Sequence, residues 1–206
     1  TISIVVANLA IVGFFSSIFS GSSTSYFARK FKVEQVLLYS YFWSIITGIT
    51  IPLVFSFTSV HNDFLLYLIP ISILSSLLAT NISLFVGTQN IKLFNLYTVL
   101  QQLIHVVFIA VLIYFVKIND VSVYFLAQIF CLIILFALSF FQIVRKCSIS
   151  EFKFSTSVFK SMFEYGWKNQ FSAFIQFLNY RLSFYFLEYF EGIASVGIFS
   201  IGITFS

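Results

Sequence analysis

The sequence KNQFSAFIQFLNYRLSFYFLEYF (residues 168–190) combines the length of a membrane-spanning helix with a charged residue in its interior. At about 1.5 Å per residue, Arg181 lies roughly 21 Å from Trp167 and roughly 12 Å from Tyr189 along such a helix. A charge at this depth costs about 2.5–3.5 kcal/mol when it faces lipid. The stretch therefore predicts a helix whose Arg181 side chain faces a hydrated cavity or an anionic partner.

The composition of the whole chain is that of a membrane protein. Of its 206 residues, 60% are hydrophobic and 9% are charged, whereas soluble domains carry about 25% charged residues. So few polar residues cannot cover a water-facing surface of this size, and we expect a polytopic helix bundle. The two cysteines, Cys131 and Cys147, are expected to be free thiols.

Apolar runs divide the chain into expected membrane spans of about 20 residues each. The runs are 2–26, 36–57, 64–87, 93–116, 122–144 and 168–190, and a seventh begins at 194–206. Most connections are short, which favours antiparallel neighbours, and the long one covers 145–167. Because the chain lacks an initiator methionine and ends inside an apolar run, we expect it to be an internal piece of a longer protein.

Basic residues alternate between the connections and predict their sidedness. Nine of the eleven Lys and Arg residues fall in the first, third and fifth connections: Arg29, Lys30 and Lys32; Lys92; and Arg145, Lys146, Lys153, Lys160 and Lys168. The fourth connection holds Lys117. Basic connections face the cytoplasm, so residues 29–35, 88–92 and 145–167 are predicted to be cytoplasmic.

The run 93–116 is polar in its first half. It contains Asn95, Thr98, Gln101, Gln102 and His105, and the last four share a broad helical face. These side chains either form hydrogen bonds between helices or make a patch on a central cavity that contacts sugar hydroxyls or relays protons. The run 122–144 is almost purely apolar and is predicted to touch lipid over much of its surface.

The polar residues of the run 168–190 lie on two faces of the predicted helix. Ser172, Gln176, Asn179 and Ser183 form one stripe, and Gln170, Arg181 and Glu188 lie on roughly the opposite side. One face is expected to meet neighbouring helices and the other a hydrated cavity. Arg181 either pairs with an acid on another helix, binds an anion or extends to the membrane surface.

The segment 150–167 mixes Phe with Lys, Glu and Ser, which is typical of an interfacial segment or a linker.

Three stretches resemble the Wzx-type polysaccharide flippases of the multidrug/oligosaccharidyl-lipid/polysaccharide exporter superfamily. They are GSSTSYFARKFK (21–32), FEYGWKNQFSAFIQFLNYRLSFYFLEYFEG (163–192) and IASVGIFSIGITFS (193–206). The most specific pieces are YGWKNQ, LNYR and ASVGIFSIG, while residues 36–144 match mainly in pattern. Members often carry an acid two positions after the arginine, where this chain has Ser183; this departure weighs against an ion-coupling role there.

The resemblance implies an all-α fold, a fragment of a two-lobe transporter with six helices per lobe. Residues 1–145 would hold five helices of the N-terminal lobe, 146–167 the basic cytoplasmic inter-lobe loop, and 168–206 the start of the C-terminal lobe. The implied location is the bacterial inner membrane. The implied partners are a lipid-linked oligosaccharide, membrane lipids and other polysaccharide assembly proteins, without nucleic acid, cofactor or metal.

The implied activity is the transfer of undecaprenyl-pyrophosphate-linked oligosaccharide units across the membrane for surface polysaccharide (O-antigen or capsule) synthesis. Arg181 would bind the anion, and the cavity-lining candidates are Gln176, Asn179, Gln101, Gln102 and His105. The alternative is a cation-coupled small-molecule or multidrug exporter of the same superfamily. Such exporters need a membrane-buried acid, and none of the seven Asp and Glu residues is predicted at mid-membrane depth. An enzyme is not expected, because the outward connections are short and no nucleophile or phosphate-binding motif is present.

Overall fold

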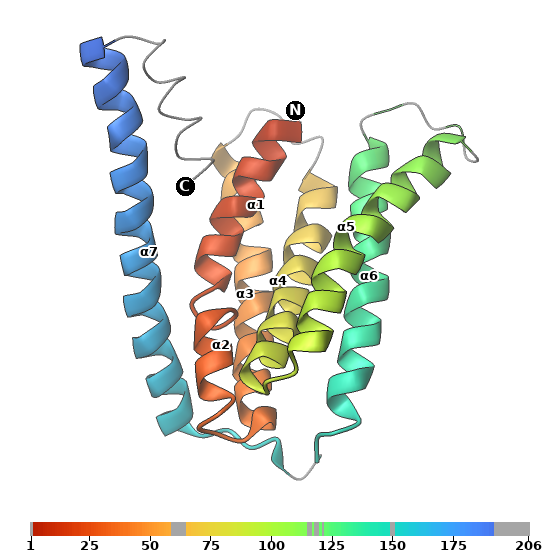
Figure 1. Cartoon of the computed structure of the whole chain (residues 1–206), viewed down its shortest axis with the longest axis vertical. Helices are drawn as coiled ribbons and strands as arrows, with labels where there is room; N and C mark the ends of the chain where they lie inside the picture. Colours follow the sequence, from red (N-terminus) through yellow and green to blue (C-terminus); the bar gives the residue numbers. More distant parts are fainter. Residues whose placement is uncertain are drawn as a thin grey trace. The chain divides into compact units, whose positions relative to one another are not determined.

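The computed structural model describes residues 2–58, 65–114, 117, 120, 122–148 and 151–191, and its regular elements there are all helices (Figure 1). In chain order they are α1 (Ile2–Ser16), α2 (Ser22–Phe27), α3 (Val33–Thr58), α4 (Leu65–Gly87), α5 (Ile91–Tyr114), α6 (Ser122–Val144) and α7 (Thr156–Glu191).

Among the residues that the structure describes, four helices are long and apolar enough to cross a membrane. They cover Val33–Phe55 of α3, Leu66–Gly87 of α4, Ile91–Tyr114 of α5 and Ser122–Val144 of α6. They agree with four of the predicted runs, and the all-α fold and the membrane class are confirmed. The predicted run 194–206 lies outside the described residues.

The predicted first helix over 2–26 is wrong as a continuous element, because α1 ends at Ser16 and α2 begins at Ser22. The hydroxyls of Ser17 and Ser20 donate to the carbonyls of Gly13 and Ser16 at 2.6 and 2.9 Å, a contact that bends helices. Gly21 then adopts a φ of +88°, which glycine reaches without steric cost. Small hydroxyl residues and a glycine together interrupt the helix.

Hydroxyl groups of neighbouring elements satisfy the interrupted backbone. The carbonyl of Phe19 accepts hydrogen bonds from Thr24 Oγ1 at 2.5 Å and from Ser40 Oγ at 3.3 Å. Ser23 Oγ donates to the carbonyl of Met162 in α7 at 3.1 Å. All of these hydroxyls are buried, so the break is placed where protein, and not lipid, completes its hydrogen bonds.

Helix α4 packs against α1, α2, α3, α5 and α6 and forms the centre of the bundle. Its buried Asn81 donates to Ser139 Oγ of α6 at 2.8 Å and accepts a hydrogen bond from Tyr41 of α3. Gly48 of α3 lies so close to Ile73 of α4 that a Cβ atom there would come within 2.8 Å of Ile73 Cγ1. A polar link across three helices and one close approach therefore define the register of the core.

Helix α6 buries one full face, which the sequence did not lead us to expect. Its buried residues recur at nearly four-residue spacing: Val123, Phe125, Ala127, Cys131, Leu132, Leu135, Ser139 and Ile143. The opposite face is exposed through Phe130, Ile133, Ile134, Leu138 and Phe141. The prediction that α6 touches lipid over much of its surface is therefore wrong for the buried face and stays a prediction for the exposed one.

Helix α7 begins at Thr156, so the predicted loop over 146–167 is wrong for its second half. The segment 156–167 has neither proline nor an interior break, and its aromatic side chains pack on the interruption after α1. Phe19 lies against Phe159 and Phe163, with ring centroids 5.3 and 6.2 Å apart. The chain divides into two compact units, Thr1–Trp167 and Lys168–Ser206, and α7 belongs to both. Their assignment to two transporter lobes stays a prediction.

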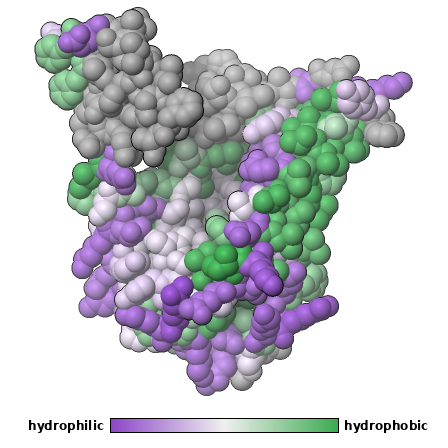
Figure 2. Space-filling view, viewed as in Figure 1, coloured by the Kyte–Doolittle hydropathy of each residue, from purple (hydrophilic) through white to green (hydrophobic). Residues whose placement is uncertain are grey.

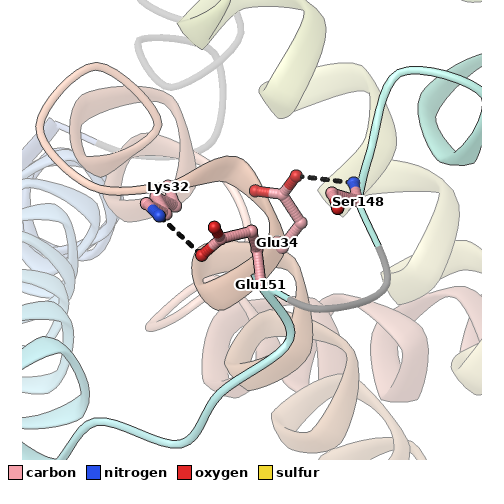
Figure 3. Close-up of polar contacts among 4 residues, drawn as sticks. All are labelled: Lys32, Glu34, Ser148 and Glu151. Atoms are coloured by element: carbon pink, nitrogen blue, oxygen red, sulfur yellow. Dashed lines mark hydrogen bonds and ion pairs between the residues drawn. The ribbon is translucent and has the colours of Figure 1, made fainter.

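Three basic connections meet at one end of the first unit, here called the basic end (residues 29–35, 88–92, 145–148 and 151–155). Arg29 Nε donates to the carbonyl of Gly87 at 3.2 Å. Lys32 Nζ pairs with Glu151 Oε2 at 2.5 Å, and the Ser148 amide donates to Glu34 Oε1 at 3.0 Å (Figure 3). Hydrophilic side chains gather at this end, at the bottom of Figure 2, and apolar side chains cover the right-hand flank above it.

Candidate functional site: a polar cavity between α5 and α6

A cavity of about 140 Å³ lies between α5 and α6, and we call it the α5–α6 cavity. Its lining residues come from the middle of α5 and the first half of α6: Gln101, Gln102, His105, Tyr124, Gln128, Cys131 and Leu132. Five of the seven carry a hydrogen-bonding amide, imidazole or phenol group. The cavity is thus a polar space between two helices, each of which is apolar enough to span a bilayer.

Contacts between the two helices hold part of the cavity wall. The imidazole of His105 meets the ring of Tyr124 edge to face, with centroids 5.0 Å apart and planes at 65°. The thiol of Cys131 lies 3.4 Å from the carbonyl oxygen of Gln101 and donates to it. The first contact orients the imidazole, and the second joins α6 to the main chain of α5.

Two polar atoms of the wall are buried without a hydrogen-bond partner. In the part of the chain that the structure describes, three buried side-chain atoms have this property, and His105 Nε2 and Gln128 Oε1 are two of them. A buried polar group without a partner costs about 1–3 kcal/mol. Native proteins keep such groups where a ligand or a water molecule completes them.

The chemistry of the lining favours an uncharged, hydroxyl-rich ligand. Amides and the imidazole both donate and accept hydrogen bonds, and no carboxylate, lysine or arginine lines the cavity. The cavity has room for several water molecules.

The structure brings together half of the predicted site. Gln101, Gln102 and His105 line the same cavity, as their shared helical face predicts. Gln176 is exposed on α7. Asn179 and Arg181 lie on the same helix, but their side chains are outside the described residues. The role of Arg181 in anion binding stays a prediction.

The α6 half of the cavity was missed from the sequence. Tyr124, Gln128 and Cys131 recur at four- and three-residue spacing, which places them on one helical face. The available signal was the amide of Gln128 between the apolar residues Ala127 and Ile129. One isolated polar residue in a membrane helix has no pattern of its own, whereas the cluster on α5 does.

Groups of three or more His, Cys, Asp or Glu residues that could hold a metal ion are absent from the described residues. The chain matches no protein-family model, and no curated protein or solved structure is significantly similar to it. The fold and the α5–α6 cavity therefore define a helical membrane protein with a polar site inside its spanning helices.

Proposed function

We propose that the protein is a membrane transporter that moves lipid-linked oligosaccharides, of the undecaprenyl-pyrophosphate type, from the cytoplasmic to the outer leaflet of a bacterial inner membrane. The observation that carries the proposal is the α5–α6 cavity, whose buried His105 and Gln128 atoms lack partners. Sugar hydroxyls supply both donors and acceptors to such atoms. The lipid portion would remain in the bilayer while the glycan crosses along polar side chains.

The charge distribution supports the proposed sidedness. The three basic connections lie together at the basic end, linked by Arg29 to Gly87 and by Lys32 to Glu151. Basic residues near membrane helices face the cytoplasm. The cytoplasmic leaflet, where lipid-linked sugars are assembled, would then meet the basic end.

The alternative, a cation-coupled small-molecule exporter, has less support. Helices α4, α5 and α6 contain no Asp or Glu, and α3 has Glu34 alone, in its first turn. A coupling cation inside the membrane would need an acidic ligand, and the uncharged cavity wall offers none. In the same wall the Cys131 thiol donates to the main-chain carbonyl of Gln101, and His105 Nε2 has no hydrogen-bond partner, so we also propose a carrier and not an enzyme.

The proposal is tested by reconstituting the protein in vesicles with a polyprenyl-pyrophosphate-linked oligosaccharide. Transfer is followed by a lectin that reaches sugar on one leaflet. Gln102→Leu and His105→Leu are expected to slow transfer, because each removes hydrogen bonds to the glycan. Asn95→Leu removes an amide from α5 outside the cavity and is the matched control. Equal transfer by all variants, or no transfer by the parent protein, would contradict the proposal.

A further inference from the structure

A second pocket lies at the basic end, where α4 and α6 finish and α3 starts. It has a volume of about 240 Å³ and is lined by Val33, Leu84, Phe85, Thr88, Asn90, Gln142, Ile143, Lys146 and Cys147. We call it the Lys146 pocket. Its inner wall is apolar, since Leu84, Phe85 and Ile143 are 2–4% exposed. Its rim carries hydroxyl, amide and ammonium groups.

Lys146 supplies the positive charge of the rim. The ends of α4 and α6 contribute partial negative charge, which Arg29 at the Gly87 and Val86 carbonyls partly offsets. The ammonium group of Lys146 lines the pocket itself and is exposed. Burial and the charge of Glu34 raise the pKa of the Cys147 thiol, so Glu34 is an acid beside the pocket. Its Oε1 atom accepts a hydrogen bond from the Ser148 amide at 3.0 Å (Figure 3).

We propose that the Lys146 pocket binds the headgroup of an anionic phospholipid. The lysine ammonium pairs with the phosphate, the side-chain amides of Asn90 and Gln142 donate to the phosphate and glycerol oxygens, and the apolar wall takes the first acyl carbons. Basic pockets between membrane helices bind anionic headgroups by this combination. A soluble anion would use the ammonium but leave the apolar wall unoccupied. The inference does not depend on the transport proposal.

Cys147 lines the pocket and reports its occupancy. Cys131→Ser leaves Cys147 as the single thiol, and the protein is reconstituted in phosphatidylcholine alone or in an equal mixture with phosphatidylglycerol. Labelling by N-ethylmaleimide, an uncharged reagent, is expected to slow in the anionic mixture. Lys146→Gln is expected to weaken this protection about fivefold, the factor for about 1 kcal/mol per basic residue at an anionic surface.

Two controls separate a bound lipid from a general surface effect. Lys160→Gln removes an exposed lysine that does not line the pocket, and it should leave the protection unchanged. Ser157→Cys combined with Cys131→Ser and Cys147→Ser leaves a single thiol at an exposed position of α7 outside the pocket, and its labelling should not depend on the pocket. Equal slowing of both thiols would overturn the proposal.

Two further outcomes would also overturn it. The first is unchanged Cys147 labelling in the anionic mixture, a measurement that needs no substitution at Lys146. The second is equal protection by inorganic phosphate in phosphatidylcholine vesicles, which would identify a free anion as the ligand. Lys146→Arg keeps the charge and is expected to keep the protection, so a folding defect of Lys146→Gln would not decide the result.

Discussion

Gly166 of α7 packs directly on the carbonyl oxygen of Ile18, inside the interruption between α1 and α2, and a Cβ atom at Gly166 would overlap that oxygen. The contact joins a helix near the end of the chain to the non-helical backbone near its beginning. It is formed between main-chain groups, so no side-chain rotation can relieve an added methyl group. The missing side chain is therefore what allows α7 to cover the break.

We expect Gly166→Ala to destabilise the protein by about 1–3 kcal/mol, the usual cost of overpacking a close contact. The measurement is thermal or denaturant unfolding in detergent. Gly13→Ala is the matched control, because nothing lies within 4 Å of a Cβ atom at Gly13, and a helical alanine is favoured over glycine by about 1 kcal/mol. Equal effects of the two substitutions would contradict the close approach.

The ion pair between Lys32 and Glu151 predicts a pH dependence of stability. Hydrogen bonding and charge from Lys32 lower the pKa of Glu151 below its usual value. A carboxyl group whose pKa is lowered by folding stabilises the protein above its unfolded pKa, about 4.3, and loses that contribution as the pH falls through the folded value. The effect is small because both side chains are exposed, at 58% and 35%.

We therefore expect Glu151→Gln to lower the thermal midpoint at pH 7 and to approach the parent protein at pH 3. Glu164→Gln, which removes the exposed carboxyl 3.9 Å from Lys160, is the control and should change the midpoint less at pH 7. A difference between Glu151→Gln and the parent protein that persists undiminished at pH 3 would show that the carboxylate charge does not stabilise this contact.

The link from Tyr41 through Asn81 to Ser139 is expected to stabilise the packing of α3, α4 and α6. Asn81→Ala removes both hydrogen bonds and should cost about 1–2 kcal/mol, the upper part of the range for such bonds in membrane proteins. Ser75→Ala is the control, since the Ser75 hydroxyl bonds within α4 to the Ser72 carbonyl at 3.1 Å. Unfolding by denaturant is the measurement, and equal loss in both variants would reject the interhelical role.

Gln128→Leu is expected to make the protein more stable and less active. The amide oxygen of Gln128 is buried without a partner, so its replacement by an apolar group removes a desolvation cost of about 1–3 kcal/mol. Transfer of the lipid-linked glycan should fall, because the ligand loses an acceptor. Gln142→Leu, outside the α5–α6 cavity, is the comparison. Lower stability together with normal transfer would mean that Gln128 is structural.

Run length and apolar composition were enough to predict α3 to α6, because a membrane helix needs about 20 apolar residues and satisfies its own backbone. The interruption between Ser17 and Gly21 could not be predicted in the same way. Its apolar flanks are those of a continuous helix, and its stability depends on Ser40 and on the Met162 carbonyl, which are distant in sequence.

The start of α7 was missed for a related reason. Residues 156–167 mix aromatic side chains with Ser, Lys and Glu, a composition that also fits an interfacial segment. The packing of Phe159 and Phe163 on Phe19 stabilises the helix. In the candidate site, a cluster of polar residues on α5 predicted Gln101, Gln102 and His105. The isolated Gln128 of α6 can be assigned to the site only from the packing of α6 against α5.

The interruption after Ser16 also limits how the beginning of the chain can meet a bilayer. Helix α1 has 15 residues and α2 has 6, which correspond to about 22 Å and 9 Å of helix length. Helix α2, which has both ends inside the chain, is far shorter than a hydrocarbon layer about 30 Å thick. The bonds of Thr24 and Ser40 to the Phe19 carbonyl thus fasten a six-residue helix to its neighbours, and without them α2 would be too short to hold its place in a membrane.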